Sequence, residues 1–266
     1  MTSSMEKSLL RQSLRNHIRL RRRALSSQEQ SDAALRVVSR VMNDARIRSA
    51  RTLAVFLSFD GELDTRPLID ALWAAGKQVY LPVLHPFTPG HLLFMRYSAT
   101  TPLVLNRLRI REPRLDITTL LPLAGLDVLF TPLVAFDAQG QRLGMGGGFY
   151  DRTLQHWRPL AGFYPIGLAH DCQQVADTLP VEEWDIGLPE IITPSHHWRW
   201  HDAGAKKRLT PFLPFVSPIG RGAEACATPA TWAPAKRDYR GRRWAYLTFA
   251  HGGESHRAPR IPVGPQ

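Results

Sequence analysis

The amino-acid sequence predicts an α/β fold: a single, mainly parallel sheet flanked by helices, with a basic N-terminal helix and a poorly ordered C-terminal tail. Short apolar runs alternate with segments of helical periodicity over residues 25–195, which is typical of parallel strands covered by helices. A glycine-rich segment follows one of these runs, where such sheets bind ligands. Residues 202–266 are rich in Pro, Gly, Ala and Arg and lack any sustained period. We therefore predict an α/β domain over 1–200 and a largely disordered tail over 201–266.

The first 43 residues predict two helices. Residues 5–24 place leucine and isoleucine at near-helical spacing among many arginines, which indicates an amphipathic helix with a basic face. Ser26 and Glu29 have the spacing of a capping box, in which each residue satisfies a free amide of the other at a helix start. The second helix is expected to begin there and to run to about Asn43.

The sheet is expected to start with the apolar run 52–58. A turn at 59–62 follows, and then a helix at 65–75 that Gly76 can close. Another helix is expected at 149–157. The remaining strand-like runs are 78–82, 92–97, 128–136, 163–169 and 189–193.

The positive charge is concentrated at the two ends of the chain. The net charge is +11, but residues 1–23 hold seven Lys and Arg against one Glu, and residues 202–266 hold eleven against four acidic residues. The segment between them is slightly acidic. A nucleic-acid-binding protein that uses these basic ends is therefore an alternative function, although it leaves the glycine-rich segment unexplained.

Other features of the composition indicate where in the cell the protein is expected and which kinds of site are not expected. No apolar run approaches the roughly 20 residues of a membrane span. The two cysteines, Cys172 and Cys226, are far apart and have no metal-ligand spacing, so a disulfide scaffold or a structural zinc site is not expected. His196 and His197 are adjacent at a strand end and are expected to point to opposite sides. A cytoplasmic protein without a membrane partner is predicted.

The segment 142–152 is the most informative part of the chain. It places four glycines among five residues, between Arg142 and Asp151. Glycines allow positive φ and close approach of the backbone to a ligand, and inward-turned amides at a helix start bind phosphate oxygens. The arginine can neutralise an anion and the aspartate can hold Mg²⁺. We interpret the segment as a nucleotide-phosphate loop, although a Walker motif is absent.

The string Phe-Asp-x-x-Gly-x-Arg-Leu-Gly-x-Gly-x-Gly-Phe-Tyr-Asp at 136–151 closely resembles the signature of the 5-formyltetrahydrofolate cyclo-ligase family. It departs from that signature only at Phe149, where the family has tyrosine. Further similarity is found at 11–26, at 56–65 and at 180–185. The resemblance covers about residues 7–195 in matching order.

The resemblance implies an ATP-dependent enzyme that converts 5-formyltetrahydrofolate to 5,10-methenyltetrahydrofolate, releasing ADP and phosphate. Mg²⁺ is the implied metal. The implied ATP-binding residues are Arg11, Gln12, Ser13, Leu14, Arg15, Arg142, Leu143, Gly144, Met145, Gly146, Gly147, Gly148, Phe149 and Tyr150. The implied folate-binding residues are Leu57, Glu62, Met145, Gly146, Gly147, Gly148 and Phe149. Arg142 and Tyr150 are implied to be catalytic, and Asp151 and Asp185 to hold the metal.

A third function stays open beside the cyclo-ligase and the nucleic-acid-binding protein. Another small-molecule phosphotransferase with the same loop would share everything except the folate-side positions Leu57 and Glu62. A monomer that binds ATP and a reduced folate is the expectation, because no heptad repeat indicates a coiled coil.

Overall fold

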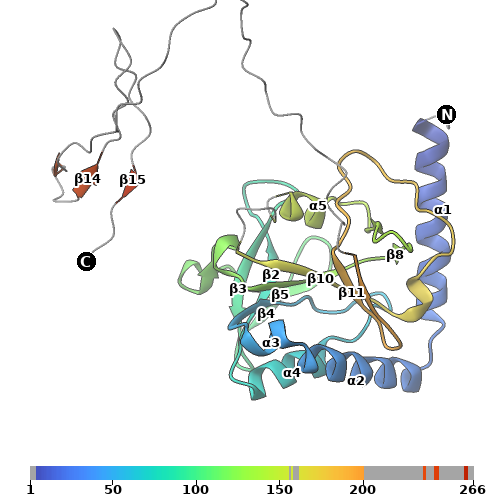
Figure 1. Cartoon of the computed structure of the whole chain (residues 1–266), viewed down its shortest axis with the longest axis horizontal. Helices are drawn as coiled ribbons and strands as arrows, with labels where there is room; N and C mark the ends of the chain where they lie inside the picture. The colour runs from blue at the N-terminus through green and yellow to red at the C-terminus, as the bar shows by residue number, and fades with distance from the viewer. Residues whose placement is uncertain are drawn as a thin grey trace, which may run out of the picture. The chain divides into compact units, whose positions relative to one another are not determined.

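The computed structural model describes residues 4–155, 157 and 162–200, together with three short strands in the tail (Figure 1). The chain divides into two compact units, Met1–Leu209 and Thr210–Gln266. In the second unit, β13 (Lys236–Arg237), β14 (Arg243–Ala245) and β15 (Ile261–Pro262) pair as a small antiparallel sheet. The predicted disorder of the rest of the tail concerns residues outside those described.

The first unit is built on one eight-stranded sheet in the order β12-β11-β10-β7-β1-β2-β3-β6. Its central pairs, from β11 to β2, are parallel, whereas β3, β6 and β12 pair in antiparallel fashion at the two sides. The strands are β1 (Thr52–Ala54), β2 (Gln78–Leu84), β3 (Leu92–Tyr97), β6 (Leu120–Leu121), β7 (Val128–Pro132), β10 (Tyr164–Leu168), β11 (Glu190–Ile192) and β12 (His197–Arg199). The predicted α/β class with a mainly parallel sheet is confirmed.

Two small two-stranded sheets accompany it. One pairs β4 (Leu103–Leu105) with β5 (Arg111–Pro113), and the other pairs β8 (Ala135–Phe136) with β9 (Arg142–Leu143). The helices are α1 (Ser4–Arg23), α2 (Ser27–Asn43), α3 (Ala45–Ser49), α4 (Arg66–Ala74) and α5 (Phe149–Leu154), with short 3₁₀ turns at Ile117–Thr119, Leu123–Gly125 and Asp171–Gln173.

The two predicted N-terminal helices are present at the expected places. Ser26 caps α2 and forms the predicted capping box with Glu29. The apolar face of α2, with Ala33, Val37 and Val41, packs with α4 against one face of the sheet (Figure 1). The other face packs against α5 through a cluster that includes Leu154. The sheet is therefore the middle of three layers.

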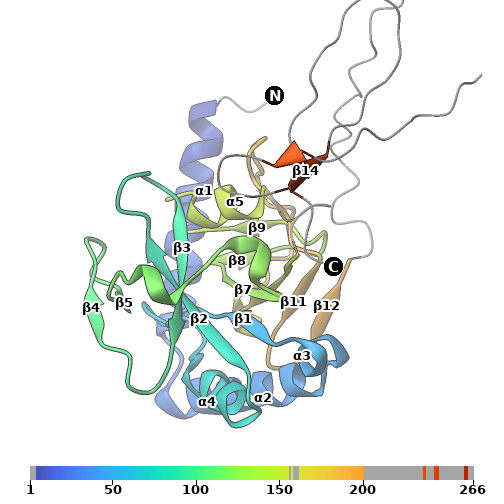
Figure 2. The same cartoon turned by 90° about the vertical axis from the view of Figure 1, so that its left-hand side faces the viewer.

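The predicted continuous strand 128–136 is wrong, because the chain bends in its middle. Pro132 ends β7, since proline has no amide hydrogen with which to continue a ladder. The chain bends at Val134, whose amide donates to the carbonyl of Leu143, and β8 then pairs with β9. The bend carries the glycine-rich segment off the sheet. Figure 2 shows β8, β9 and α5 grouped above the end of β7.

The first sheet strand is also shorter than its apolar run. β1 ends at Ala54, and only the amide of Val55 still bonds to the neighbouring strand, at the Tyr80 carbonyl. Phe56 and Leu57 therefore leave the ladder and line a cavity at the carboxyl end of the strand. Gly76, with φ of 73°, closes α4 as predicted.

Candidate functional site

The glycine-rich segment forms a loop between β9 and α5 whose backbone only glycine accommodates well. Gly146 has φ of 96° and Gly148 has φ of 68°, which is the left-handed region that side chains disfavour. A Cβ on Gly147 would lie 2.7 Å from the ring of Phe149. The loop conformation thus depends on its composition.

Arg142 and Asp151 join the two ends of this loop. Nη2 of Arg142 donates to Oδ1 of Asp151 at 2.5 Å, and the arginine side chain is 2% exposed. Burial lowers the pKa of Arg142, while the charges of Asp151 and Asp185 oppose that change. Nε of Arg142 is buried without a hydrogen-bond partner among the described residues. An unpaired donor of this kind is ready to bind an added anion.

Helix α1 presents two arginines one turn apart, of which Arg15 contacts the loop and Arg11 contacts the segment 180–185. Nε of Arg15 donates to the Gly144 carbonyl at 2.8 Å. Both guanidinium amines of Arg11 donate to Asp185, the second at 3.0 Å, and Nη1 also donates to the Pro180 carbonyl at 2.7 Å. Burial, and next the charge of Arg11, lowers the pKa of Arg15. Two cations are therefore held side by side at the edge of the loop.

These groups surround a cavity of about 890 Å³. Of the residues predicted for the site, those that line it are Arg11, Gln12, Arg15, Leu57, Glu62, Arg142, Gly144, Met145, Gly146, Gly147, Gly148, Phe149, Tyr150, Asp151 and Asp185. Three predicted residues do not. Ser13 is exposed, and Leu14 packs against the cluster that contains buried Leu143. The volume suits a ligand of the size of a nucleotide or a folate.

Glu62 is a buried carboxylate that lines the same cavity. Its side chain is 5% exposed, and burial raises its pKa to about 7, against the charge of Arg22 and the amide of Phe59. That amide donates to Oε2 of Glu62 at 3.3 Å. Burial, and next the charge of Glu62, also raises the pKa of Tyr150. Strongly perturbed groups of this kind mark functional sites.

The hairpin of β4 and β5 lines the cavity and was not predicted as part of the site. Oδ1 of Asn106 accepts the amides of Leu108 and Ile110 in the turn, and Oε2 of Glu112 accepts the amide of Leu84 at the end of β2. Asparagine between apolar runs is a hairpin signal. That signal could have revealed the hairpin, but only the tertiary structure places it over the cavity. Trp184, 62% exposed, lines the cavity too.

Comparison with known proteins decides the family. The model of the 5-formyltetrahydrofolate cyclo-ligase family matches residues 6–194. This chain belongs to the 5-formyltetrahydrofolate cyclo-ligase family. The match covers α1 from residue 6 onward, the glycine loop, Glu62 and Asp185.

Relatives and a solved structure agree with this cyclo-ligase assignment. The chain is 60% identical over 183 residues to the 5-formyltetrahydrofolate cyclo-ligase of Escherichia coli K12, covering 69% of this chain and 100% of that protein. It is 51% identical to that of Haemophilus influenzae, covering 68% and 96%. The structure of 5,10-methenyltetrahydrofolate synthetase from Aquifex aeolicus superposes with a TM-score of 0.62 at 25% identity, covering 77% and 100%.

The two carboxylates expected to hold a metal in this cyclo-ligase site fit Mg²⁺ to different degrees. Oδ2 of Asp151 makes no hydrogen bond to any residue within the described ranges, so one oxygen is available to a cation. Both oxygens of Asp185 are engaged, by Arg11 and by the amide of Glu182. Mg²⁺ takes one or two carboxylates together with phosphate and water oxygens. Asp151 can bind as it stands, whereas Asp185 must first release Arg11.

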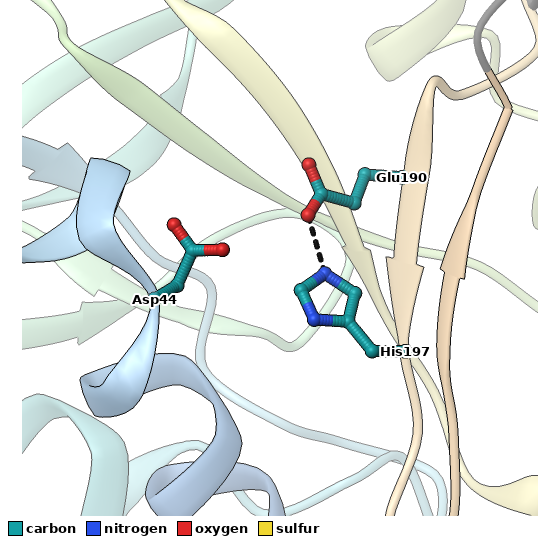
Figure 3. Close-up of side chains that lie close together, drawn as sticks. All are labelled: Asp44, Glu190 and His197. Carbon is teal, nitrogen blue, oxygen red and sulfur yellow. Dashed lines mark hydrogen bonds and ion pairs between the residues drawn. The ribbon is translucent and has the colours of Figure 1, made fainter.

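Asp44, Glu190 and His197 form a second group of candidate ligands (Figure 3). None of the three lines the cyclo-ligase cavity. Nε2 of His197 contacts Oε1 of Glu190, and the His197 side chain is 21% exposed, whereas its neighbour His196 is exposed to solvent. Arg199 also bonds to both carboxylates, and Arg46 bonds to Glu190 at 2.7 Å. Because cations already occupy these oxygens, the group is an ion-pair network between α3 and the β11–β12 hairpin.

Two further expectations concern the rest of the chain. Cys172 is a free thiol, and burial raises its pKa, which suits a structural rather than a reactive cysteine. Among the helices of the described residues, none is both long and apolar enough to cross a membrane.

Proposed function

We propose that this chain catalyses the ATP-dependent conversion of 5-formyltetrahydrofolate to 5,10-methenyltetrahydrofolate, with release of ADP and phosphate. Membership of the cyclo-ligase family supports the reaction. One observation supports assigning this reaction to particular residues. The glycine loop, with Arg142 and Asp151, and the buried carboxylate of Glu62 line the same cavity.

The chemistry explains why such a cavity is needed. A formamide oxygen is a poor leaving group, so the reaction first converts it to a phosphate ester. The formyl oxygen attacks the γ-phosphorus of ATP, and the bond to the ADP oxygen breaks. N10 then attacks the formyl carbon and loses its proton, the C–O bond breaks, and phosphate leaves with the oxygen. Phosphoryl transfer of this kind asks a protein for positioning and charge neutralisation rather than for a nucleophile.

The loop and its arginines supply these two requirements. Amides of Gly144–Gly148 bind the β- and γ-phosphates, and Arg142 neutralises charge that develops on the transferred group, since its buried Nε has no hydrogen-bond partner in the described part of the chain. Arg11 and Arg15 reach the nucleotide from α1. Donors that are fixed in a buried site stabilise a transition state without reorganising. Tyr150 closes the pocket beside the reacting atoms, and its burial keeps the phenol protonated.

The folate occupies the part of the cavity near Glu62. The ionised carboxylate accepts hydrogen bonds from the amino and ring N–H groups of the pterin, which form a planar donor edge. Leu57, Met145 and Phe149 line the same cavity as apolar walls. Asp151, and Asp185 if it released Arg11, would hold Mg²⁺, which would supply charge neutralisation on the phosphates.

One assay tests the proposal. Purified protein with ATP, Mg²⁺ and 5-formyltetrahydrofolate should form the methenyl chromophore, which absorbs in the near ultraviolet, with stoichiometric release of phosphate. Omitting ATP should abolish both signals. Absence of product over a range of pH and salt concentrations would contradict the proposal. We further expect a cytoplasmic monomer whose α/β domain, 1–200, carries the whole activity.

A further inference from the structure

Arg22 is an arginine with no solvent exposure in the last turn of the otherwise basic, exposed face of α1. Its neighbours Arg21 and Arg23 are exposed. Burial of a guanidinium is costly unless its charge and its donors are matched. A buried arginine beside two exposed ones therefore calls for a specific role.

Arg22 holds the turn that carries Glu62. Nε of Arg22 donates to the Asp60 carbonyl at 2.8 Å, and Nη2 donates to Oδ2 of Asp60 at 2.9 Å. Arg19 and Arg23 bond to the same carboxylate, and although burial raises its pKa, the three arginines lower it to about 2. Asp60 has φ of 54°, a left-handed conformation that a non-glycine residue keeps only when contacts impose it.

The turn is packed directly against the end of α1. A Cβ on Gly61 would lie 3.2 Å from the Arg22 carbonyl oxygen, and Nε2 of Gln30 bridges that oxygen and the Gly61 carbonyl at 3.3 Å each. The last turn of α1 therefore helps to fix the position of Glu62.

The same arginine faces the carboxylate of Glu62. Nη2 of Arg22 lies 3.9 Å from Oε1 of Glu62, and Nη1 of Arg22 has no hydrogen-bond partner among the described residues. The other ionisable groups that face Glu62 are Asp60 in its own turn, Tyr150 of α5 and His170 next to the 3₁₀ turn 171–173. Burial, and next the charge of Arg22, lowers the pKa of His170 to about 4. Arg22 is consequently the cation that acts on Glu62.

We infer that Arg22 is a positioning residue for folate recognition: it fixes the turn 59–62 so that Glu62 faces the cavity, and its charge favours the ionised carboxylate that accepts the pterin N–H groups. The inference rests on the proposed function. It assigns no contact between Arg22 and either substrate, because the residue is buried behind the turn and does not line the cavity.

Steady-state kinetics of the full-length protein test the role. Arg22→Met should raise KM for 5-formyltetrahydrofolate at least tenfold and leave KM for ATP within about twofold, since the arginines that face the loop are untouched. Arg22→Lys keeps a charge but loses the two-pronged contact with Asp60, so its KM for the folate should lie between those of Arg22→Met and the parent. Arg21→Met, on the exposed side of the same turn, is the matched control and should match the parent.

The pH profile separates this role from a general loss of structure. For the parent, kcat/KM for the folate reports the free protein and should rise through about pH 7 as Glu62 ionises. In Arg22→Met the rise should move to higher pH, whereas in Arg22→Lys it should stay near that of the parent. A purely structural defect lowers the amount of active protein and leaves the midpoint in place.

The other possible results distinguish a failure of the proposed function from a failure of the role of Arg22. An inactive parent contradicts the proposed function. An active parent, with Arg22→Met changing both KM values equally or leaving the pH midpoint unchanged, overturns the role of Arg22 alone. Should Arg22→Met fail to fold, Asp60→Asn removes the anchor of Arg22; it should raise KM for the folate selectively, and a parent-like KM overturns the inference.

Discussion

Arg142 and Asp151 form an ion pair across the glycine loop, from the last strand before it to the first turn of the helix after it. The side chain of Arg142 is 2% exposed, and that of Asp151 is 17% exposed. The ion pair fixes the span of a loop whose glycines would otherwise leave many conformations open. The loop is thereby organised before any ligand arrives, which reduces the entropy lost on binding.

Arg142→Met should lower kcat at least tenfold, because removing one fixed charge-stabilising donor from such a site costs about 3 kcal/mol. Formation of the methenyl chromophore at saturating ATP and folate measures the change. Arg36→Met, at an exposed position of α2, is the control and should keep the parent rate. A kcat within twofold of the parent in Arg142→Met would argue against a role in the transition state.

Asp151→Asn and Asp185→Asn should differ in their dependence on Mg²⁺. Oδ2 of Asp151 makes no hydrogen bond to the residues that the structure describes, so Asp151→Asn should raise the Mg²⁺ concentration for half-maximal rate at least tenfold. Asp185 is bound to Arg11, so Asp185→Asn frees that arginine as well and should raise both this concentration and KM for ATP. If Asp185→Asn changes KM for ATP without changing the Mg²⁺ requirement, Asp185 acts by orienting Arg11 and not as a metal ligand.

Gly146→Ala should impair ATP use far more than it impairs folding. The residue has φ of 96°, a conformation that alanine disfavours. Alanine should therefore shift the backbone of the loop that is proposed to bind phosphate. KM for ATP should rise at least tenfold. Gly76→Ala introduces comparable strain, at φ of 73° with open space around the added methyl, but at the end of α4. Gly76→Ala should lower the melting temperature about as much as Gly146→Ala but leave KM for ATP unchanged. The comparison separates the effect on stability from the effect on ATP use.

Glu62→Gln should stabilise the protein relative to the parent, and this stabilisation should be larger at pH 8 than at pH 5. The folded-state pKa of about 7 lies above the ordinary value of 4.5. As pH rises between these values the unfolded chain loses a proton that the folded chain keeps, so Glu62 progressively destabilises the fold. Above pH 7 the cost is on the order of 1–3 kcal/mol, and glutamine removes it. Thermal unfolding at both pH values measures the difference. Asp70→Asn, at an exposed ion pair, is the control for the exchange of a carboxylate for an amide.

Truncation after Trp200 should leave kcat and both KM values within about threefold of the full-length values. Nε1 of Trp200 donates to the Ala138 carbonyl, and its ring stacks on Trp198, so the cut must keep this residue. Truncation after Arg199 is the comparison and should lower the melting temperature. A large loss of activity on removing 201–266 would show that the tail contributes to the site.

The sequence predicts elements best where a local rule is strong. The capping box at Ser26 and Glu29 placed the start of α2, and Gly76 placed the end of α4. The glycine string identified the loop and its two charged ends. These features depend on neighbours within a few residues, so they can be derived without knowing the fold.

The unpredicted features depend on contacts between distant segments. The bend at Val134 exists because its amide bonds to Leu143, and nothing in the apolar run 128–136 indicates it. The pairing of Arg11 with Asp185 joins positions 174 residues apart. Arg21, Arg22 and Arg23 are alike in sequence, and only the packing of the 59–62 turn buries the middle one.

The edges of the large sheet have a consequence for how the molecule behaves at high concentration. Its outermost strands are β6, with two residues, and β12, with three. Arg199 on β12 is held by Asp44 and Glu190, which keeps a charge at that border. Short edge strands offer few amides with which a strand of another molecule could pair, and the charge on β12 disfavours such pairing further. The edges of the sheet therefore disfavour aggregation through pairing with strands of other molecules.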